Sequence, residues 1–515
     1  MAQPPRSPLW SKTGRSLWMA VAAAVCLQVL PGADALRWMP EDPWAFVPRV
    51  FRPGARADVP EDAPIDGEVD DDALLALGPS AAQVAHGAEV EGEEEGATPD
   101  AGLGPAPASA DLEPSLVIAA DDGLPRPPRM GRTAGGLPLL PIEDPQGSLR
   151  RLYHRLAAIE RGEAHVVRVL HYGDSLLTGD YVTKTVRRLL QKRFGDAGHG
   201  FVLAGKPAPW YRRDKLHLTT SDDWEVYRLT KPKIRDGLYG LGGVTFLTHE
   251  AGAWVRFEPS GDDLGAAVSK MRVFYLAQPR GGRFELKVDD RKIEVDTRAD
   301  AKVERVAEIT VPDGPHVLGV RTLGHGEVRL FGAVLEREGP GVTYDALGLD
   351  GTRVRLLRKF NAEHWHTQLR QRRPDLLVLQ YGTNESQLAH LGMDAYKADL
   401  TQIVGHLRAA LPGVGCLLVS PLDRAEKDEH GKLVTRPVVK RIVDAQREVA
   451  LKQGCAFWNT WRAMGGEGSM ARWYKARPSL GRGDLTHPTW RGAERVGAML
   501  FAALMEGYRE ALAKR

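Results

Sequence analysis

The spacing of hydrophobic and polar positions changes several times along the chain, and each change predicts a different kind of element. Between residues 139 and 219, a helical stripe over 149–159 precedes an almost wholly apolar run over 166–170. An amphipathic run over 182–194 follows, with apolar residues three and four positions apart. This order predicts a helix, a buried strand, a tight turn and a second helix.

The next segment, 220–339, has a period of two. Short alternating runs are separated by turns rich in Gly, Asp and Pro. Such spacing is typical of an antiparallel β-sandwich.

From residue 340 to residue 515, apolar strands again alternate with amphipathic helices. The predicted strands are 342–349, 376–380, 414–419 and 455–458. This alternation predicts an α/β domain with a parallel sheet and helices on both faces. Because α/β elements stand on both sides of 220–339, we expect the sandwich to be inserted into this domain.

The N-terminal part differs from the rest in composition. Residues 1–35 combine basic residues, a short apolar run and a small-residue end, which predicts an export signal or, if it is not cleaved, a membrane anchor. Residues 36–138 are rich in Pro, Ala, Gly and acidic residues, which predicts a disordered linker. The chain is therefore expected to be exported to a periplasmic or extracellular location.

Charge and cysteine content narrow the classes further. The formal net charge of the 515 residues is +2, without a basic tract, so nucleic acid is not an expected partner. Only Cys26, Cys416 and Cys455 are present, too few for a disulfide scaffold. The latter two lie in apolar runs, and we expect buried free thiols there. No motif indicates a metal or cofactor.

Candidate chemistry begins at the turn that contains Gly173, Asp174 and Ser175. A serine between a buried strand and a helix stands at the carboxyl end of a parallel sheet, where ligands of such sheets bind. One hypothesis makes Ser175 a nucleophile, and the other makes it only a helix N-cap.

Other polar residues follow other predicted strands. Gly351 and Asn384 each come directly after a strand, so they are expected to meet Ser175 at one edge of the sheet. Asp484 lies three residues before His487, and it can turn back to bind Nδ1 of that imidazole. Nε2 would then be free to accept a serine proton.

Four blocks in this order resemble those of the SGNH or GDSL hydrolases. They are Gly-Asp-Ser-Leu at 173–176, the glycine at 351, Gly-x-Asn at 382–384 and Asp-x-x-His at 484–487. The resemblance implies a flavodoxin-like parallel sheet. With the inserted sandwich and the export segment, the chain is similar to peptidoglycan O-acetylesterases, whose insert resembles a carbohydrate-binding module.

The resemblance assigns roles that the chemistry also requires. Ser175 would attack an ester carbonyl, His487 would act as general base and then acid, and Asp484 would orient the imidazole. The backbone N–H groups of Ser175 and Gly351 and the side-chain amide of Asn384 would form the oxyanion hole.

Several further residues receive weaker assignments. Asp174 is expected to be structural, and Thr178, Tyr381 and Glu385 are candidates for shaping the pocket. His199 is expected to stabilise a loop. Four sandwich aromatics could form a sugar platform, but we expect a core position for most of them; they are Trp224, Tyr227, Tyr239 and Trp254.

Three functions remain open at this point. The first is an exported serine esterase that removes a small acyl group, such as acetyl, from a cell-wall or extracellular glycan. The second is a glycan O-acyltransferase with the same triad, and the third is a non-catalytic glycan-binding protein. In the first two cases an acylated glycan is the expected partner, with membrane contact only through an uncleaved N-terminal segment.

Overall fold

A computed structural model describes residues 124–513 except 164, 262 and 389. The predicted export signal and most of the predicted linker lie outside the described residues. All described residues belong to one compact unit. No helix in this described part is long and apolar enough to cross a membrane.

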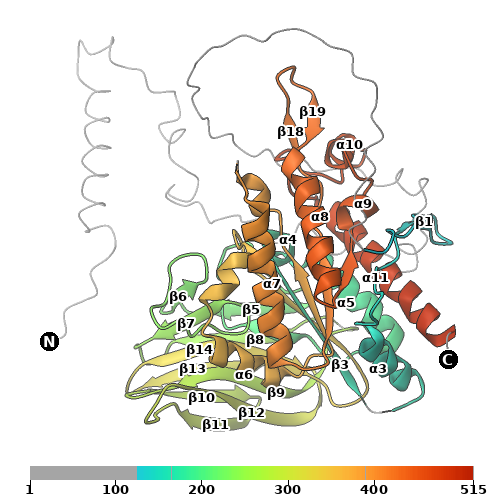
Figure 1. The fold of residues 1–515 in the computed structure, drawn as a ribbon. Helices are drawn as coiled ribbons and strands as arrows, with labels where there is room; N and C mark the ends of the chain where they lie inside the picture. Colours follow the sequence, from blue (N-terminus) through green and yellow to red (C-terminus); the bar gives the residue numbers. More distant parts are fainter. Residues whose placement is uncertain (1–123, 164, 262, 389, 514–515) are drawn as a thin grey trace, which may run out of the picture. The chain divides into compact units, whose positions relative to one another are not determined.

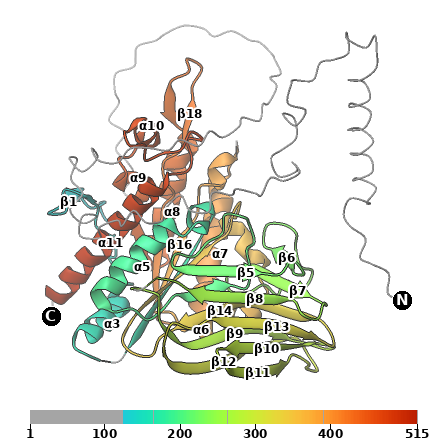
Figure 2. The same cartoon turned by 180° about the vertical axis from the view of Figure 1, so that it is seen from behind.

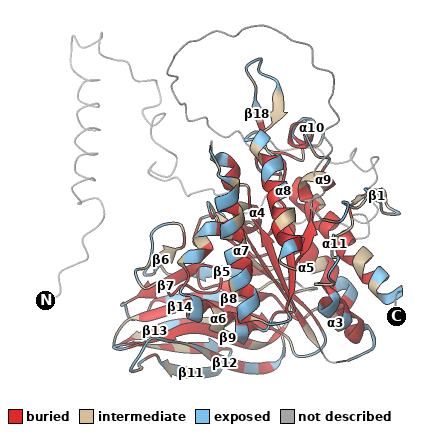
Figure 3. Cartoon of the chain, in the orientation of Figure 1, coloured by how far each residue is buried: buried red, intermediate tan, exposed pale blue. Residues whose placement is uncertain are grey.

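The α/β domain is built on a five-stranded parallel sheet (Figure 1). In spatial order its strands are β15 (Gly341–Gly348), β3 (Val166–Gly173), β16 (Leu376–Gln380), β17 (Gly415–Val419) and β20 (Ala456–Trp458). When these five strands are numbered by their position in the chain, their spatial order is 2-1-3-4-5, the flavodoxin-like order. The strands are buried almost without interruption, as Figure 3 shows, because helices cover both faces.

Two groups of helices cover the sheet. The face seen in Figure 1 carries one group, and the opposite face, seen in Figure 2, carries the other. The first group comprises α6 (Ala362–Arg372), α7 (Met393–Ala410) and α8 (Pro437–Lys452). The second comprises α3 (Arg150–Glu160), α5 (Tyr181–Phe194) and α11 (Trp490–Ala513). The predicted fold class, an α/β domain with a separate antiparallel part, is confirmed.

Shorter elements connect this framework. They are β1 (Gly131–Arg132), β2 (Pro138–Leu139), α4 (Ser175–Thr178), η5 (Val354–Lys359), η6 (Glu385–Gln387), β18 (Ala425–Lys427), β19 (Leu433–Thr435), α9 (Thr460–Ala463) and α10 (Ser469–Lys475).

The antiparallel part consists of two sheets. One has the order β11 (Arg291–Asp296), β10 (Arg283–Val288), β13 (Leu318–Gly324), β8 (Trp254–Pro259) and β5 (Leu216–Thr220). The other has the order β12 (Val303–Gly314), β9 (Val268–Ala277), β14 (Val328–Glu336), β7 (Val244–Thr248) and β6 (Glu225–Arg228), with β4 (Gly200–Leu203) also paired to β14. Tyr275 on β9 contacts Phe284 on β10 edge to face, with ring centroids 5.3 Å apart, so the sheets share a core.

The insertion begins earlier than the predicted boundary at residue 220. Both β4 and β5 precede that boundary, yet they pair with sandwich strands β14 and β8. The chain leaves the α/β domain at Asp196 and returns at Val342, and these two residues form a parallel bridge. Pairing between strands that are distant in the chain carries no local sequence signal, which explains the difference.

The linker also ends earlier than predicted. Residues 124–138 were expected to be disordered, but they are described and lie against the α/β domain. Arg447 donates to the carbonyl oxygen of Pro125, and Arg462 Nη1 donates to that of Pro128 at 2.7 Å. Prolines leave backbone carbonyls free as acceptors, so a proline-rich segment can be held without a core of its own.

The expectation of free thiols at Cys416 and Cys455 is wrong, because these residues form a disulfide. Strands β17 and β20 are neighbours with Leu417 opposite Ala456, which sets the two cysteines side by side with Cα atoms 4.8 Å apart. That separation suits a disulfide. The apolar pattern indicated burial correctly but could not indicate which strands are adjacent.

Replacing both cysteines by alanine is expected to lower the free energy of unfolding by about 4 kcal/mol. The bridge closes a loop with a sequence separation of 39, and this value follows from the chain entropy that such a loop removes from the unfolded state. Urea unfolding measures the loss. Reduction of the wild type should reproduce it, and reduction should not affect the double variant; unchanged wild-type stability on full reduction would contradict the prediction.

Candidate active site

Ser175 lies where β3 ends and the short helix α4 begins. Asp174 is the N-cap of α4, and its Oδ1 accepts a hydrogen bond from the Leu176 N–H at 3.1 Å. A Cβ atom on Gly173 would stand 2.8 Å from the carbonyl oxygen of Gln380, so the turn requires glycine there. The serine is thereby held at the carboxyl edge of the sheet.

Hydrogen bonds link this serine to a histidine and, through it, to an aspartate. Ser175 Oγ lies 2.8 Å from Nε2 of His487, and Nδ1 of His487 lies 2.7 Å from Oδ2 of Asp484. Oδ1 of Asp484 also accepts the backbone N–H groups of Thr486 at 3.0 Å and His487 at 2.9 Å. The three side chains form a continuous hydrogen-bonded series, the geometry of a Ser–His–Asp triad.

The ionisation of Asp484 suits this arrangement. Burial alone would raise its pKa, but hydrogen bonds from the His487 ring and from two backbone N–H groups outweigh that effect and lower the pKa to about 2. The carboxylate therefore stays charged at neutral pH, where it can stabilise an imidazolium beside it. The His487 side chain is 35% exposed, so the series is open to solvent.

The loops after β15 and β16 are joined beside the serine. Asn384 Nδ2 donates to the Thr352 carbonyl at 3.1 Å, and Arg353 Nε donates to the Asn384 carbonyl at the same distance. The Glu385 carboxylate accepts the backbone N–H groups of Val354 at 2.7 Å and Gly382 at 3.1 Å. These bonds bring the Gly351 and Asn384 loops together.

Donors are left over in this region. Within the described residues, the backbone N–H groups of Ser175 and Gly351 have no acceptor. Asn384 uses Nδ2 for one bond, and this nitrogen carries two hydrogens. Gly351 has φ of +69°, a conformation that favours glycine. The two backbone N–H groups and the second hydrogen of Asn384 Nδ2 are therefore donors of the kind that stabilise a developing oxyanion.

Two buried carboxyl groups lie beneath these loops. Burial raises the pKa of Asp174 to about 6 and that of Glu385 to about 7, against the opposing effect of backbone hydrogen bonds. The charge of Asp174 also raises the pKa of Glu385. Thr178 and Tyr381 are buried as well, each 2% exposed, so they support the site from below rather than face solvent.

Asp174 predicts a pH dependence of stability. Its folded pKa lies above the ordinary value of 3.8, so its contribution is complete below about pH 4 and is lost as pH rises through about 6. The loss amounts to about 3 kcal/mol. Asp174→Asn, which cannot titrate, should flatten the unfolding free energy between pH 4 and 8. Parallel pH curves for wild type and variant would contradict this.

The structure also shows a residue at the site that the sequence did not single out. Trp210, between β4 and β5, is 58% exposed, and its Nε1–H donates to Oδ2 of Asp350 at 2.5 Å. Asp350 directly precedes Gly351. On the same side, Thr230 Cγ2 lies 3.9 Å from where a Cβ of Gly351 would stand. Segments that adjoin sandwich strands therefore flank the Gly351 loop.

Other candidates lie elsewhere. His199 is buried, and its Nε2 lies 2.8 Å from the Gly265 carbonyl, which fits a loop-stabilising role. Burial lowers its pKa to about 3. The expectation that most of the four sandwich aromatics contribute to the core is met in part. Tyr239 is buried in the core, and Trp224 and Tyr227 are half-buried and pack against it. Trp254, at the start of β8, is 41% exposed.

Among the described residues, no group of three or more His, Cys, Asp or Glu side chains is arranged to hold a metal ion.

The parallel sheet and its strand order define a flavodoxin-like α/β fold, and Ser175 with its hydrogen-bonded histidine lies at the carboxyl edge of that sheet. A model of the GDSL-like lipase/acylhydrolase family matches residues 312–495. Residues 312–495 are thus similar to the SGNH/GDSL hydrolases. The matched range contains Gly351, Asn384, Asp484 and His487, whereas Ser175 lies before it, on the other side of the insertion.

One solved structure shares the fold of this chain. A structure described as "Peptidoglycan O-acetylesterase in action" is 23% identical, with a TM-score of 0.60, and the match covers 70% of this chain and 96% of that one. A family two carbohydrate esterase from Cellvibrio japonicus is 11% identical over 58% of this chain and 99% of that one, with a TM-score of 0.25. A family two carbohydrate esterase from Clostridium thermocellum is 9% identical, with a TM-score of 0.26, and the match covers 57% of this chain and 100% of that one. No curated protein matches the chain.

Proposed function

We propose that this chain is an exported serine esterase that removes acetyl groups from a cell-wall or extracellular glycan. The observation that carries the proposal is the series from Ser175 Oγ through the His487 ring to Asp484, with 2.8 Å and 2.7 Å between the bonded atoms. In this reaction Ser175 attacks the ester carbonyl while His487 Nε2 accepts its proton. His487 then gives this proton to the departing sugar oxygen, which leaves as a hydroxyl group. Water, deprotonated by His487, cleaves the acyl-enzyme in a second, equivalent step that releases acetate and restores the Ser175 hydroxyl.

The oxyanion of each tetrahedral intermediate would be bound by the free N–H groups of Ser175 and Gly351 and by the Asn384 amide. The bonds from Asn384 to Thr352 and from Arg353 to Asn384 fix these donors before substrate arrives. Such preorganisation is the main source of rate acceleration in acyl transfer.

A glycan substrate is supported by the surroundings of the site. The Gly351 loop is flanked by Thr230 and by the exposed Trp210 indole, both outside the α/β segments. Exposed aromatic rings offer apolar faces on which sugar rings can stack. The solved relative with a TM-score of 0.60 is described as a peptidoglycan O-acetylesterase, which agrees with this substrate class.

Export is supported by two features. The basic and apolar N-terminal segment has the order of an export signal. The Cys416–Cys455 disulfide is a bond that persists in oxidising compartments and is rare in the cytosol.

The function is tested by incubating the purified protein with O-acetylated peptidoglycan and with the same polymer after chemical deacetylation. Release of free acetate from the first polymer only is the expected result. Adding an acceptor oligosaccharide distinguishes hydrolysis from transfer, because a transferase would move the acetyl group onto the acceptor. Absence of acetate release from this polymer and from aryl acetates would overturn the esterase proposal.

Trp210→Ala is expected to raise KM for an acetylated oligosaccharide about fivefold to tenfold, through loss of a stacking face worth about 1 kcal/mol. Trp210→Phe keeps a ring but lacks the N–H that binds Asp350, so it should retain most of the sugar affinity. Steady-state kinetics on the oligosaccharide and on an aryl acetate make the comparison. Trp254→Ala, at another exposed sandwich tryptophan, is the matched control; an equal change in both alanine variants would contradict a role specific to Trp210.

A further inference from the structure

A cavity lies far from the triad, between the sandwich and the α/β domain. Its volume is about 610 Å³, within the range of sites for small ligands. It is lined by β9, β12 and the end of β14 on one side and by β3 and the last turn of α6 on the other. Arg168, near the start of β3, is seven residues before Ser175, so roughly 20 Å of strand separate this cavity from the serine.

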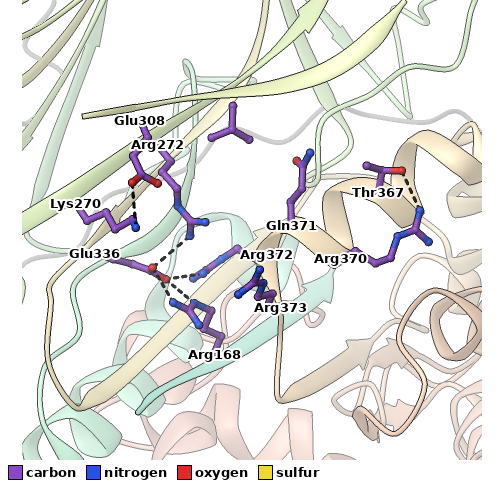
Figure 4. A pocket seen from close by; sticks show the side chains of 11 residues that line it. Arg168, Lys270, Arg272, Glu308, Glu336, Thr367, Arg370, Gln371, Arg372 and Arg373 are labelled. Carbon is purple, nitrogen blue, oxygen red and sulfur yellow. Dashed lines mark hydrogen bonds and ion pairs between the residues drawn. The ribbon is translucent and has the colours of Figure 1, made fainter. Parts of the chain in front are cut away.

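The lining is strongly cationic, as Figure 4 shows. Six cationic side chains face only two carboxylates, Glu308 and Glu336. The cationic residues are Arg168, Lys270, Arg272, Arg370, Arg372 and Arg373.

Part of this charge is compensated. Three arginines converge on Glu336: Arg168 Nε at 2.8 Å, Arg372 Nη1 at 2.5 Å and Arg272 Nη2 at 3.2 Å. Arg372 also binds Asp345 at 2.6 Å. This buried network joins the two parts of the molecule, and it accounts for Arg168 and Arg372 as structural residues.

Lys270 also has a partner, because its Nζ lies 3.0 Å from Oε1 of Glu308. Arg370, Arg373 and Arg272 are compensated less well. Arg370 is exposed and donates only to the Thr367 hydroxyl at 3.0 Å, and Arg373 has no carboxylate partner among the described residues. Arg272 shares Glu336 with two other guanidinium groups, and its Nε is buried without a hydrogen-bond partner in the described part. Burial lowers the pKa of Arg272, a sign that its charge is incompletely compensated.

A helix dipole explains some basic residues here, because Arg370 and Arg372 lie in the last turn of α6. Such an effect is small for exposed charges and is confined to the last turn of the helix. It does not explain Arg272 on the opposite wall, where no helix ends. The unbonded Nε of Arg272 is a donor available to an acceptor at that wall.

We propose that this cavity is a binding site for an anionic ligand whose phosphate or carboxylate groups bind Arg272, Arg370 and Arg373. Arginine is suited to both groups because its planar fork of donors matches two oxygens at once. The cavity volume corresponds to a ligand of about disaccharide size, such as an acidic sugar or a short phosphate chain. The site is separate from the esterase site and does not depend on the esterase activity.

The proposal is tested with the variant Arg370→Gln/Arg373→Asn. Both side chains are exposed, and asparagine tolerates the left-handed backbone at residue 373, where φ is 54°. Isothermal titration with tripolyphosphate and with trigalacturonate probes the phosphate and carboxylate arms. The wild type should bind at least one probe saturably, and the variant should bind it about tenfold or more weakly, with a smaller salt dependence.

The matched control is Arg280→Asn/Arg509→Gln. Arg280 is likewise exposed with a left-handed φ of 59°, and Arg509 is 67% exposed on α11, so the charge change is the same but lies outside the cavity. This control should bind the probe within twofold of wild type. Equal weakening in both double variants would show nonspecific charge attraction, and no saturable binding of either probe to the wild type would also overturn the proposal.

Discussion

Ser175→Ala is expected to lower kcat for hydrolysis of an aryl acetate by about 10⁴-fold or more. The serine hydroxyl is the atom that lies 2.8 Å from His487 Nε2, and alanine offers no oxygen to form the acyl-enzyme. KM should change little, since the small hydroxyl contributes to the reacting state rather than to ground-state binding. Steady-state rates measure the loss, and mass spectrometry of the quenched wild type should detect an acetylated serine that the variant lacks.

Ser260→Ala is the control for this substitution. Ser260 follows β8 in the sandwich and is half-buried, so its loss removes a hydroxyl without touching the triad. It should retain wild-type turnover. Comparable turnover in the wild type and Ser175→Ala would exclude Ser175 as the nucleophile.

Asn384→Ala should reduce kcat by about 10²- to 10³-fold, the usual cost of one oxyanion donor. The Asn384 amide is 8% exposed and is held by its bond to the Thr352 carbonyl, so it is already aimed before the reaction begins. Because the donor acts mainly on the charged intermediate, kcat should fall far more than KM rises. Aryl acetate kinetics test this directly.

Asn361→Ala provides the comparison. Asn361 is the N-cap of α6, where its side chain accepts the His364 N–H at 3.1 Å. Its loss should cost about 1 kcal/mol of stability and leave turnover unchanged. A wild-type kcat in Asn384→Ala would exclude this amide from the oxyanion hole.

The α/β elements could be predicted because their signals are local. Buried parallel strands such as β16 are continuous apolar runs, and helices such as α8 show a regular apolar stripe. Strand adjacency has no local signal. For that reason the Cys416–Cys455 bond and the pairing of β4 with β14 were missed.

For the candidate site, too, residues with a local sequence motif could be predicted and residues without one could not. Motif spacing singled out Ser175, Gly351, Asn384 and the Asp484–His487 pair, and the structure brings Ser175, His487 and Asp484 into one hydrogen-bonded series. Trp210 could not be assigned, because its bond to Asp350 exists only once the segment between β4 and β5 lies against the Gly351 loop. A tryptophan near a proline-rich turn has no distinguishing pattern of its own.

The parallel bridge between Asp196 and Val342 has a consequence for the ancestry of such chains. The two ends of the sandwich meet at one point of a single strand–helix–strand crossover, so a short turn there would complete the hydrolase without rerouting any strand. One recombination event could therefore add or delete the whole module. Chains that share this triad are free to carry different modules, or none, at the same junction.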